Sequence, residues 1–527
     1  MDTAKGQIIP DNTLGAEKSV VNSNANTDRI NGGARRGANL FHSFREFSVR
    51  EGRAAFFSNP TGVENIFSRV TGDRRSDISG TLGVADGNAN LFFMNPNGIF
   101  FGPNARLDMR GSFLASTANS LLFDGGLEFS ASNPQAPPML AINIPIGLQF
   151  RDNPRRITNW SVADDVGLQV ASGKTLSLVG GDVNLEGGKL TATGGRVELG
   201  GLAEPGTVGL EITDNIFKLN FPYNNLLANV TLADDARVNV GGGGGGDIAA
   251  HANILSMRDG GRLVGGVEST GNGGNITVNS NEINISGVGQ SEISSGIYQQ
   301  VVNNASGNLG NITVNTNSFK ASFGALVGNF ILSGATGNGG HINITAQNLS
   351  LTDGAKIGTS TFGNGNAGTV KINAQDSISL VGIGTGIYSY VENGAVGNAG
   401  DIEIKARSMS MSDEAALSSS TWRQQNTLGQ PSHAGTVSLE ISDVLSLQGS
   451  SGIFNNVESG AVGQGGEVKI QAGSLSLLNG SQIQTIVRDA NTNQPAGRGN
   501  AGNVNIDVRD ALTISGTNDA NRKPSAI

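Results

Sequence analysis

The sequence contains no cysteine, and aromatic residues make up only 5% of its 527 residues. The absence of cysteine excludes disulfide scaffolds, thiolate zinc sites and cysteine nucleophiles. Proline is also scarce, at 14 residues, and glycine has no three-residue period, so a collagen helix is excluded. No apolar run approaches 18 residues, which excludes a transmembrane helix, and residues 1–15 lack the apolar core of a signal peptide.

Charged residues are few and unevenly distributed. Residues 1–156 hold 16 Lys and Arg against 14 Asp and Glu, whereas residues 157–527 hold 19 against 30. The acidic second part argues against a nucleic-acid partner, which needs a basic footprint. The first part also contains 14 of the 21 Phe and 14 of the 24 Arg residues, so the composition divides the chain in two.

Glycine is abundant, at 78 residues, and much of it marks a repeat. A glycine followed by one residue and then Ile or Val recurs with a mean spacing of about 32 residues. These signature glycines are Gly246, Gly274, Gly310, Gly340, Gly368, Gly400, Gly435, Gly466 and Gly502. A period of this length is typical of a solenoid.

Each repeat alternates apolar and polar residues. After Gly400, for example, the pattern predicts strands over residues 401–406, 408–413 and 415–421. One copy cannot bury a core alone, but copies stacked at about 4.8 Å place like residues over like residues. The repeat therefore predicts an all-β fold, a parallel β-helix. Since an open first coil would pair with other chains, the Arg- and Phe-rich N-terminal part is expected to cap it.

The N-terminal motifs resemble those of a known family. The segments are QIIPDNTLG (7–15), GANLFHSFREFSV (37–49), NIFSRVTG (65–72), ISGTLGV (78–84) and NANLFFMNPNGIFFGPNARLDMRGSFLAST (88–117). They resemble the secretion domain of filamentous-haemagglutinin-like exoproteins, the A partners of two-partner secretion. The resemblance is close over residues 7–125 and looser over 126–230.

The resemblance implies a right-handed β-helix that is exported unfolded across the outer membrane. It implies a partner, an outer-membrane β-barrel transporter whose periplasmic domains recognise the N-terminal domain. The family's NPNGI signal is carried here by Asn95, Pro96, Asn97, Gly98 and Ile99, which also read as a tight turn. A second family motif, NPNL, is only half present, because Asn59 and Pro60 are followed by Thr61 and Gly62. The weaker signal candidates are Asn59, Pro60, Asn65, Arg69 and Val70.

These observations predict five segments. They are a disordered start (1–6), a two-partner secretion (haemagglutination activity) domain (7–130), further coils with extra-helical strands (131–240), a repetitive shaft (241–516) and a disordered tail (517–527).

No catalytic, cofactor or metal site is predicted. The adjacent acidic pairs, Asp164–Asp165, Asp234–Asp235 and Asp413–Glu414, are expected in turns, since neighbouring strand residues face opposite ways. Two GxGxxG matches, beginning at Gly363 and Gly497, run into strands rather than helices and so do not indicate a dinucleotide site. The four His residues show no ligand spacing.

The expected function is that of a secreted or surface-exposed exoprotein, outside the outer membrane, that acts as an adhesin. Its target would be a host or neighbouring-cell surface, with carbohydrate among the candidates. One alternative is a β-helical, pectin-lyase-like enzyme, a lyase or hydrolase of polysaccharides. A further alternative is the stalk of a larger toxin-delivery exoprotein.

Overall fold

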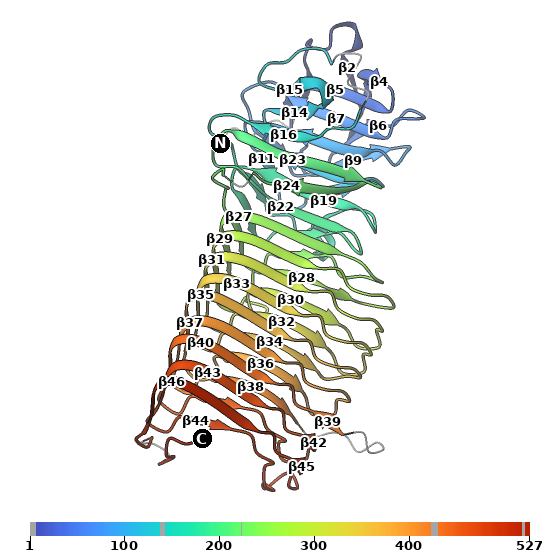
Figure 1. The fold of residues 1–527 in the computed structure, drawn as a ribbon. Coiled ribbons are helices and arrows are strands. Elements are labelled where there is room, and N and C mark those ends of the chain that lie inside the picture. Colours follow the sequence, from blue (N-terminus) through green and yellow to red (C-terminus); the bar gives the residue numbers. More distant parts are fainter. Residues whose placement is uncertain (1–6, 138–142, 223, 423–430, 519–521) are drawn as a thin grey trace. The chain divides into compact units, whose positions relative to one another are not determined.

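The computed structural model describes residues 7–137, 143–222, 224–422, 431–518 and 522–527, and it is almost entirely β (Figure 1). The helical elements of the described residues are three short 3₁₀ turns: η1 (Gly15–Glu17), η2 (Asp124–Gly126) and η3 (Ala163–Asp165). None of the described helices is long and apolar enough to cross a membrane. The chain divides into two compact units, residues 1–240 with 246–256, and residues 241–245 with 257–527.

The first unit is built of parallel strands that stack coil upon coil. Its first parallel sheet runs in the order β5 (Asn39–Phe47), β7 (Asn65–Val70), β10 (Asn90–Met94), β13 (Phe113–Ser116), β19 (Thr175–Gly180), β22 (Arg196–Gly201) and β27 (Asp247–Arg258). Its second contains β8 (Ser76–Ile78), β11 (Ile99–Phe101), β17 (Ile157–Asn159), β20 (Val183–Glu186) and β25 (Val230–Ala233). The third side contains β3 (Thr27–Gly32), β6 (Ala54–Ser58), β9 (Thr81–Ala85) and β12 (Arg106–Asp108), and then β18 (Leu168–Gln169), β21 (Lys189–Thr191) and β26 (Arg237–Asn239).

Antiparallel strands cover the first coil of this unit. Strands β1 (Ile8–Pro10) and β4 (Ala34–Arg36) pair with the outer edge of β5, and β2 (Ser19–Ser23) pairs with β3. The backbone groups that a first coil would leave open are therefore bonded within the chain. This is the N-terminal cap expected from the sequence.

An antiparallel sheet packs against the outer face of the first parallel sheet. It runs in the order β15 (Leu127–Ser130), β14 (Ser120–Phe123), β16 (Gly147–Phe150), β23 (Gly206–Thr213) and β24 (Ile216–Asn220). Phe41, Phe67 and Phe92 on stacked strands meet Phe129 and Phe217 of this sheet in one buried cluster. Part of the excess of Phe in the first part of the sequence thus fills the layer between these two sheets.

The second unit is a regular stack of coils. Its long strands are β29 (Ile276–Ser286), β31 (Ile312–Ser322), β33 (Ile342–Thr352), β35 (Val370–Val381), β37 (Ile402–Ser412), β40 (Val437–Leu447), β43 (Val468–Leu478) and β46 (Val504–Ser515). Its shorter strands are β28 (Arg262–Val267), β30 (Gly296–Val301), β32 (Leu326–Ile331), β34 (Lys356–Thr361), β36 (Gly386–Val391), β38 (Ala416–Thr421), β41 (Gly452–Phe454) and β44 (Gln482–Gln484). A third side carries β39 (Ser432–His433), β42 (Val462–Gln464) and β45 (Arg498–Asn500). Within each unit the strands of successive coils are parallel, so the predicted all-β, parallel β-helical fold is confirmed.

The first two strands predicted in each repeat are one strand in the structure. Residues 401–406 and 408–413 were expected to be separate, but β37 runs from Ile402 to Ser412 with an irregular register after Ala406. The apolar alternation changes phase at this irregularity, which explains why the sequence pattern reads as two segments. The third predicted strand corresponds to β38.

The core of the second unit contains an aliphatic row and a polar row side by side. The aliphatic row is fully buried and consists of Leu263, Ile297, Val327, Ile357, Ile387, Leu417, Ile453 and Ile483. The polar ladder, two residues further along each strand, consists of Gln299, Asn329, Thr359, Ser389, Ser419 and Asn455.

The polar ladder satisfies the signature corners. Thr359 donates to the carbonyl of Gly368 (2.6 Å), Ser419 to that of Gly400 (3.1 Å) and Asn455 to that of Gly435 (2.6 Å). A Cβ on Gly368 would clash with the carbonyl of Gly340 in the preceding coil. The signature therefore requires glycine because the backbones of neighbouring coils approach too closely for a side chain.

A second ladder explains much of the asparagine content. At the corners before five signature glycines, from Gly274 to Gly400, an Asn side-chain oxygen accepts the backbone N–H of the equivalent residue one coil later. The ladder runs through Asn272, Asn308, Asn338, Asn366 and Asn398 to His433, with N···O distances of 2.8–3.0 Å. These corners need polar side chains that bond a neighbouring backbone, which Asn does readily.

The end of the chain departs from expectation. Residues 517–527 were predicted to be a disordered tail, but Thr517 pairs with Pro524 and Ala526 pairs with Gln482 of the last short strand. Ala526 also donates its N–H to the carbonyl of Ser481, so the described part of the tail is bonded to the start of β44. Residues 1–6, the predicted disordered start, and residues 519–521 lie outside the described part of the chain.

Candidate functional site

Residues 95–99 form the corner that joins β10 to β11. The Asn95 side-chain oxygen accepts the backbone N–H of Asn97 at 2.9 Å, and the Gly98 N–H donates to the Asn95 carbonyl at 3.1 Å. This is an Asx turn within a β-turn, in which Pro96 occupies the position that favours its fixed φ. The tight turn predicted for these residues is present.

The corner is bonded to the preceding coil. Asn95 is fully buried, and its side-chain nitrogen donates to the Arg74 carbonyl at 3.0 Å and to the Ser76 hydroxyl at 2.9 Å. The Asn97 side chain donates to the Gly72 carbonyl at 2.7 Å. Each amide therefore bonds residues of the 72–76 loop as well as the turn itself.

Gly98 and Ile99 continue the corner into the core. Gly98 has a φ of 110°, which a residue with a side chain rarely adopts, and its carbonyl accepts the Ser76 N–H at 3.0 Å. Ile99 is 2% exposed and lies between Ser76 and Ile157 of the adjacent coils. In the folded protein only Pro96 and Asn97 of the five residues are partly exposed.

Asn59 and Pro60 begin a different corner, after β6. The Asn59 side chain donates to the Val63 carbonyl at 2.9 Å and accepts the Ala89 N–H at 3.0 Å. The Val63 N–H donates back to the Pro60 carbonyl at 3.0 Å, which closes the turn. Asn59 thus bonds its own corner to the one a coil later.

Asn65 belongs to a buried ladder of amides. Its side chain donates to Asn39 at 3.2 Å and accepts from Asn90 at 3.0 Å, so three stacked strands are joined in one row. Asn90 also donates to Asn215 at 2.9 Å and accepts the Ser112 N–H. A row of this kind fixes the register between coils, because one shifted coil would leave buried amides unpaired.

Arg69 is fully buried and binds two segments distant in sequence. Its guanidinium donates to the carbonyls of Ser130 (2.8 Å) and Gln135 (3.0 Å), and to the hydroxyls of Ser43 (2.9 Å) and Thr13 (2.8 Å). It also lies 4.2 Å above the Phe129 ring centre.

Burial lowers the pKa of Arg69 to about 10, against the favourable charge of Asp11. Asp11 accepts hydrogen bonds from Ser43, Thr71 and Thr13. Burial by itself would raise the pKa of Asp11, but these hydrogen bonds outweigh it and lower the pKa. Arg69 and Asp11 are therefore linked through shared hydroxyl groups.

Three of the candidates, Asn65, Arg69 and Val70, lie on β7, and β7 pairs with β10, the strand that leads into residues 95–99. Strands β7 and β10 pair with Asn65 beside Asn90 and Arg69 beside Met94, the last residue before the 95–99 corner. Asn59 and Pro60 lie at the opposite end of this strand pair, near Ala89. The partners Thr13, Ser43 and Ser130 could not be predicted from the sequence, because they come from segments that meet only in the folded chain.

The acidic pairs lie in turns, as expected. Both members of each pair have a positive φ, between 49° and 67°. Asp164 and Asp165 are ion-paired with Arg106, Lys189 and Arg237. Among the residues that the structure describes, no group of three or more His, Asp or Glu side chains could hold a metal ion.

One buried carboxyl of the first unit has an unusual environment. Glu198 on β22 is fully buried and lies 2.6 Å from Arg196, which also pairs with Asp247. Burial raises the pKa of Glu198 to about 7, although the charge and hydrogen bond of Arg196 act in the opposite direction. Nothing in the sequence around Glu198 pointed to this.

Comparison with known proteins assigns the first part of the chain. Residues 6–250 match the family model of the TPS secretion domain, where TPS denotes two-partner secretion. The crystal structure of the HMW1 secretion domain from Haemophilus influenzae covers 96% of this chain and 100% of its own, at 16% identity and a TM-score of 0.44. The filamentous hemagglutinin secretion domain covers 66% and 97%, at 14% identity and a TM-score of 0.27. No curated protein matches the chain.

Residues 6–250 are thus a TPS secretion domain. A-partner exoproteins of two-partner secretion carry such a domain. Such a domain implies recognition by an outer-membrane transporter, and exoproteins of this kind are secreted across the outer membrane.

Proposed function

We propose that this exoprotein acts at the cell surface as an adhesin, with the second unit as its contact surface. The observation that supports this is the second unit itself, a stack of regular coils beyond the secretion domain. Stacked coils repeat similar outward positions many times, which suits adhesion through multiple weak contacts. A host or neighbouring-cell surface would be the target.

A binding assay tests the adhesin proposal. Purified residues 7–527, immobilised on beads, should retain cells or cell-surface glycoconjugates more strongly than beads that carry residues 7–256 alone. Equal retention by both would remove the proposed role of the second unit. Release of new reducing or unsaturated ends from polysaccharides would instead favour the enzyme alternative.

We further propose that residues 95–99 carry the secretion signal and are read before the chain folds. In the folded protein the polar atoms of Asn95 are bonded internally, and Ile99 is in the core. The folded corner therefore offers little for a transporter to recognise, whereas the unfolded segment exposes all five residues. This accords with export of an unfolded chain.

Secretion assays test this assignment. The chain is co-expressed, behind a signal peptide, with a cognate transporter, and the secreted and periplasmic fractions are compared. The variant with both Asn97→Ala and Gly98→Ala should accumulate in the periplasm. Asn104→Ala, in the exposed turn after β11, is the matched control and should be secreted normally. Normal export of the double variant would remove the signal role from residues 95–99.

The five weaker candidates are assigned structural roles. Asn59 and Pro60 close a corner, Asn65 holds the amide ladder, and Arg69 binds the segment at 130–135. Val70 is buried in the sheet. Arg69→Met consequently serves as a second secretion control, since it weakens the fold without changing residues 95–99. Periplasmic arrest of Arg69→Met at the level of the double variant would mean that folding, not recognition, limits export.

A further inference from the structure

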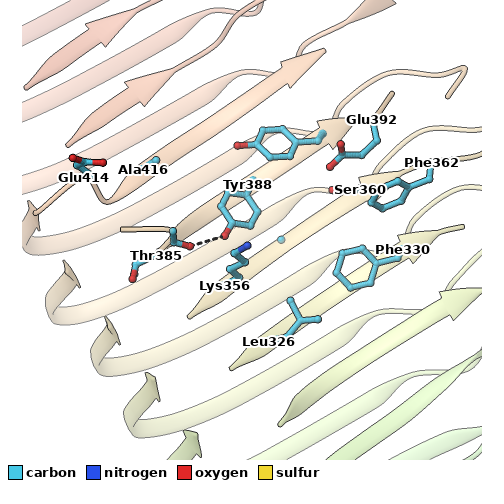
Figure 2. A pocket seen from close by; sticks show the side chains of 13 residues that line it. Leu326, Phe330, Lys356, Ser360, Phe362, Thr385, Tyr388, Glu392, Glu414 and Ala416 are labelled. Atoms are coloured by element: carbon cyan, nitrogen blue, oxygen red, sulfur yellow. Dashed lines mark hydrogen bonds between the residues drawn. The ribbon is translucent and has the colours of Figure 1, made fainter. Parts of the chain in front are cut away.

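An aromatic groove lies on the outward face of the short-strand sheet in the second unit. It has a cavity volume of about 410 Å³ and crosses strands β32, β34, β36 and β38. Its aromatic residues are Phe330, Phe362, Tyr388 and Tyr390, and its polar residues include Lys356, Ser360, Thr385, Glu392 and Glu414. Figure 2 shows the Tyr388 ring between Thr385 and Phe362.

The groove exists because glycine and serine occupy the positions beside the rings. In the sheet register Tyr388 lies beside Gly358, and Tyr390 lies beside Ser360. A Cβ on Gly358 would lie 2.7 Å from the Tyr388 ring. A larger residue in place of Gly358 on β34 would therefore occupy the space that the Tyr388 ring takes.

The rings form a continuous apolar floor. Tyr388 and Tyr390 are stacked with ring centres 5.2 Å apart, and Trp422 meets Tyr390 edge-on at 6.2 Å. The Tyr388 hydroxyl donates to the Gly384 carbonyl at 3.4 Å, which holds the ring along the strand direction. Tyr side chains offer large contact area with few rotatable bonds, which favours their use in binding.

The charges around the floor select the class of ligand. Lys356 lies 5.9 Å from the Tyr388 ring centre, so that ring already has a cation near it. Glu392 and Glu414 disfavour an anion, and burial raises the pKa of Glu392 although Lys356 acts against this. Charges of both signs beside an apolar floor favour a neutral ligand that is apolar on one face and rich in hydroxyl groups at its edge.

The backbone of the groove is not available to a ligand. Strands β34 and β36 are hydrogen-bonded to neighbouring strands on both edges. A peptide could not add to this sheet as a further strand, so a ligand must bind through side chains. The volume falls within the range of about 300–1,000 Å³ that is typical of small-ligand sites.

We propose that the aromatic groove binds a neutral, hexose-based glycan. The C–H face of a pyranose ring would lie on the tyrosine rings, and its hydroxyl groups would reach Glu392 and Lys356. This inference deepens the proposed adhesin function and rests on it. It identifies one place on the second unit where a surface glycan is held.

The test is direct titration of residues 7–527 with neutral glucose-, galactose- and mannose-based oligosaccharides of three to six units, followed by calorimetry. At least one should bind with a Kd below about 1 mM, and Tyr388→Ala should weaken it about tenfold, the effect of losing an aromatic contact. Tyr390→Phe keeps the ring and should bind within a few-fold of the original. Circular dichroism melting confirms that each variant is folded.

The matched control is Phe323→Asn. Phe323 is an aromatic residue at the corner before β32, 64% exposed and outside the groove lining. Its φ of 52° is one that Asn adopts readily, so the change should not disturb the fold. Glycan affinity should be unchanged in this variant.

Three results would overturn the proposal. They are no binding of any neutral oligosaccharide, binding that Tyr388→Ala leaves unchanged, and shortening of the bound oligosaccharide, which would make the groove catalytic. The bead assay distinguishes failure of the groove proposal from failure of the adhesin proposal. If beads carrying the original protein and beads carrying Tyr388→Ala retain cells equally, the adhesin proposal stands and the groove has no part in adhesion. Loss of retention in Tyr388→Ala supports the adhesin proposal and the groove proposal together.

Discussion

Replacing Arg69 with Met should loosen the antiparallel sheet of the first unit without unfolding the parallel coils. The guanidinium makes four hydrogen bonds, two of them to the carbonyls of Ser130 and Gln135. Met keeps much of the buried volume and removes the charge. The loss should therefore concentrate on strands β14 and β15, whose end Arg69 holds.

The size of the effect follows from two opposing contributions. Hydrogen bonds from a charged donor contribute about 1.5 kcal/mol each, or about 6 kcal/mol for four. Burial lowers the pKa of Arg69 to about 10, a fall equivalent to about 3 kcal/mol of opposing free energy. The local free energy of opening should therefore fall by about 3 kcal/mol in Arg69→Met.

Native-state hydrogen exchange measures this directly. The amides of β15, which pair with β14 from Leu127 to Ser130, should exchange about a hundredfold faster in Arg69→Met, while those of β19 should change little. Arg45→Met is the matched control, because Arg45 lies on β5 with an exposed side chain. Unchanged exchange in β15 would refute the view that Arg69 fastens this segment.

Two further predictions concern the first unit. Glu198 has a raised pKa in the folded state, about 7, so its contribution to stability is fully present below pH 4.5 and is lost as the pH rises through 7. Glu198→Gln should remove this part of the pH dependence of the free energy of unfolding, measured with urea. The same pH profile in the variant and the original protein would contradict this prediction. Asn65→Ala leaves Asn39 and Asn90 without their shared partner and should lower the free energy of unfolding by about 1–3 kcal/mol, whereas the exposed Asn104→Ala should change it by less than about 0.5 kcal/mol. Equal effects of the two Asn substitutions on the urea midpoint would show that the ladder contributes nothing.

The coil architecture could be predicted from the sequence because it is a local, repeated pattern. Alternation of apolar residues and the recurring signature glycine both lie within one coil, and every later coil repeats them. The turn at residues 95–99 could be predicted for the same reason, since Asn, Pro and Gly each have a preferred place in a turn.

The contacts that depend on distant segments could not be predicted. The sequence placed Arg69 on a strand, but its hydrogen bonds to Ser130 and Gln135 form only in the folded chain. The aromatic groove depends on Gly358 of one coil standing beside Tyr388 of the next. Each half of that pair is unremarkable in its own repeat, and the alternation that reveals the strands says nothing about which outward side chains become neighbours.

The fixed register of the coils makes them interchangeable. Leu326 pairs with Lys356 and Lys356 with Gly386, so removing residues 356–385 would bring Leu326 opposite Gly386 with every row continued. Val327 would then meet Ile387, and Asn329 would meet Ser389, as residues of the same kind already do. Genetic recombination between repeats can thus lengthen or shorten this part of the protein by whole coils without the evolution of a new core. The length of the second unit can therefore change in steps of one coil while the sequence of the first unit stays unchanged.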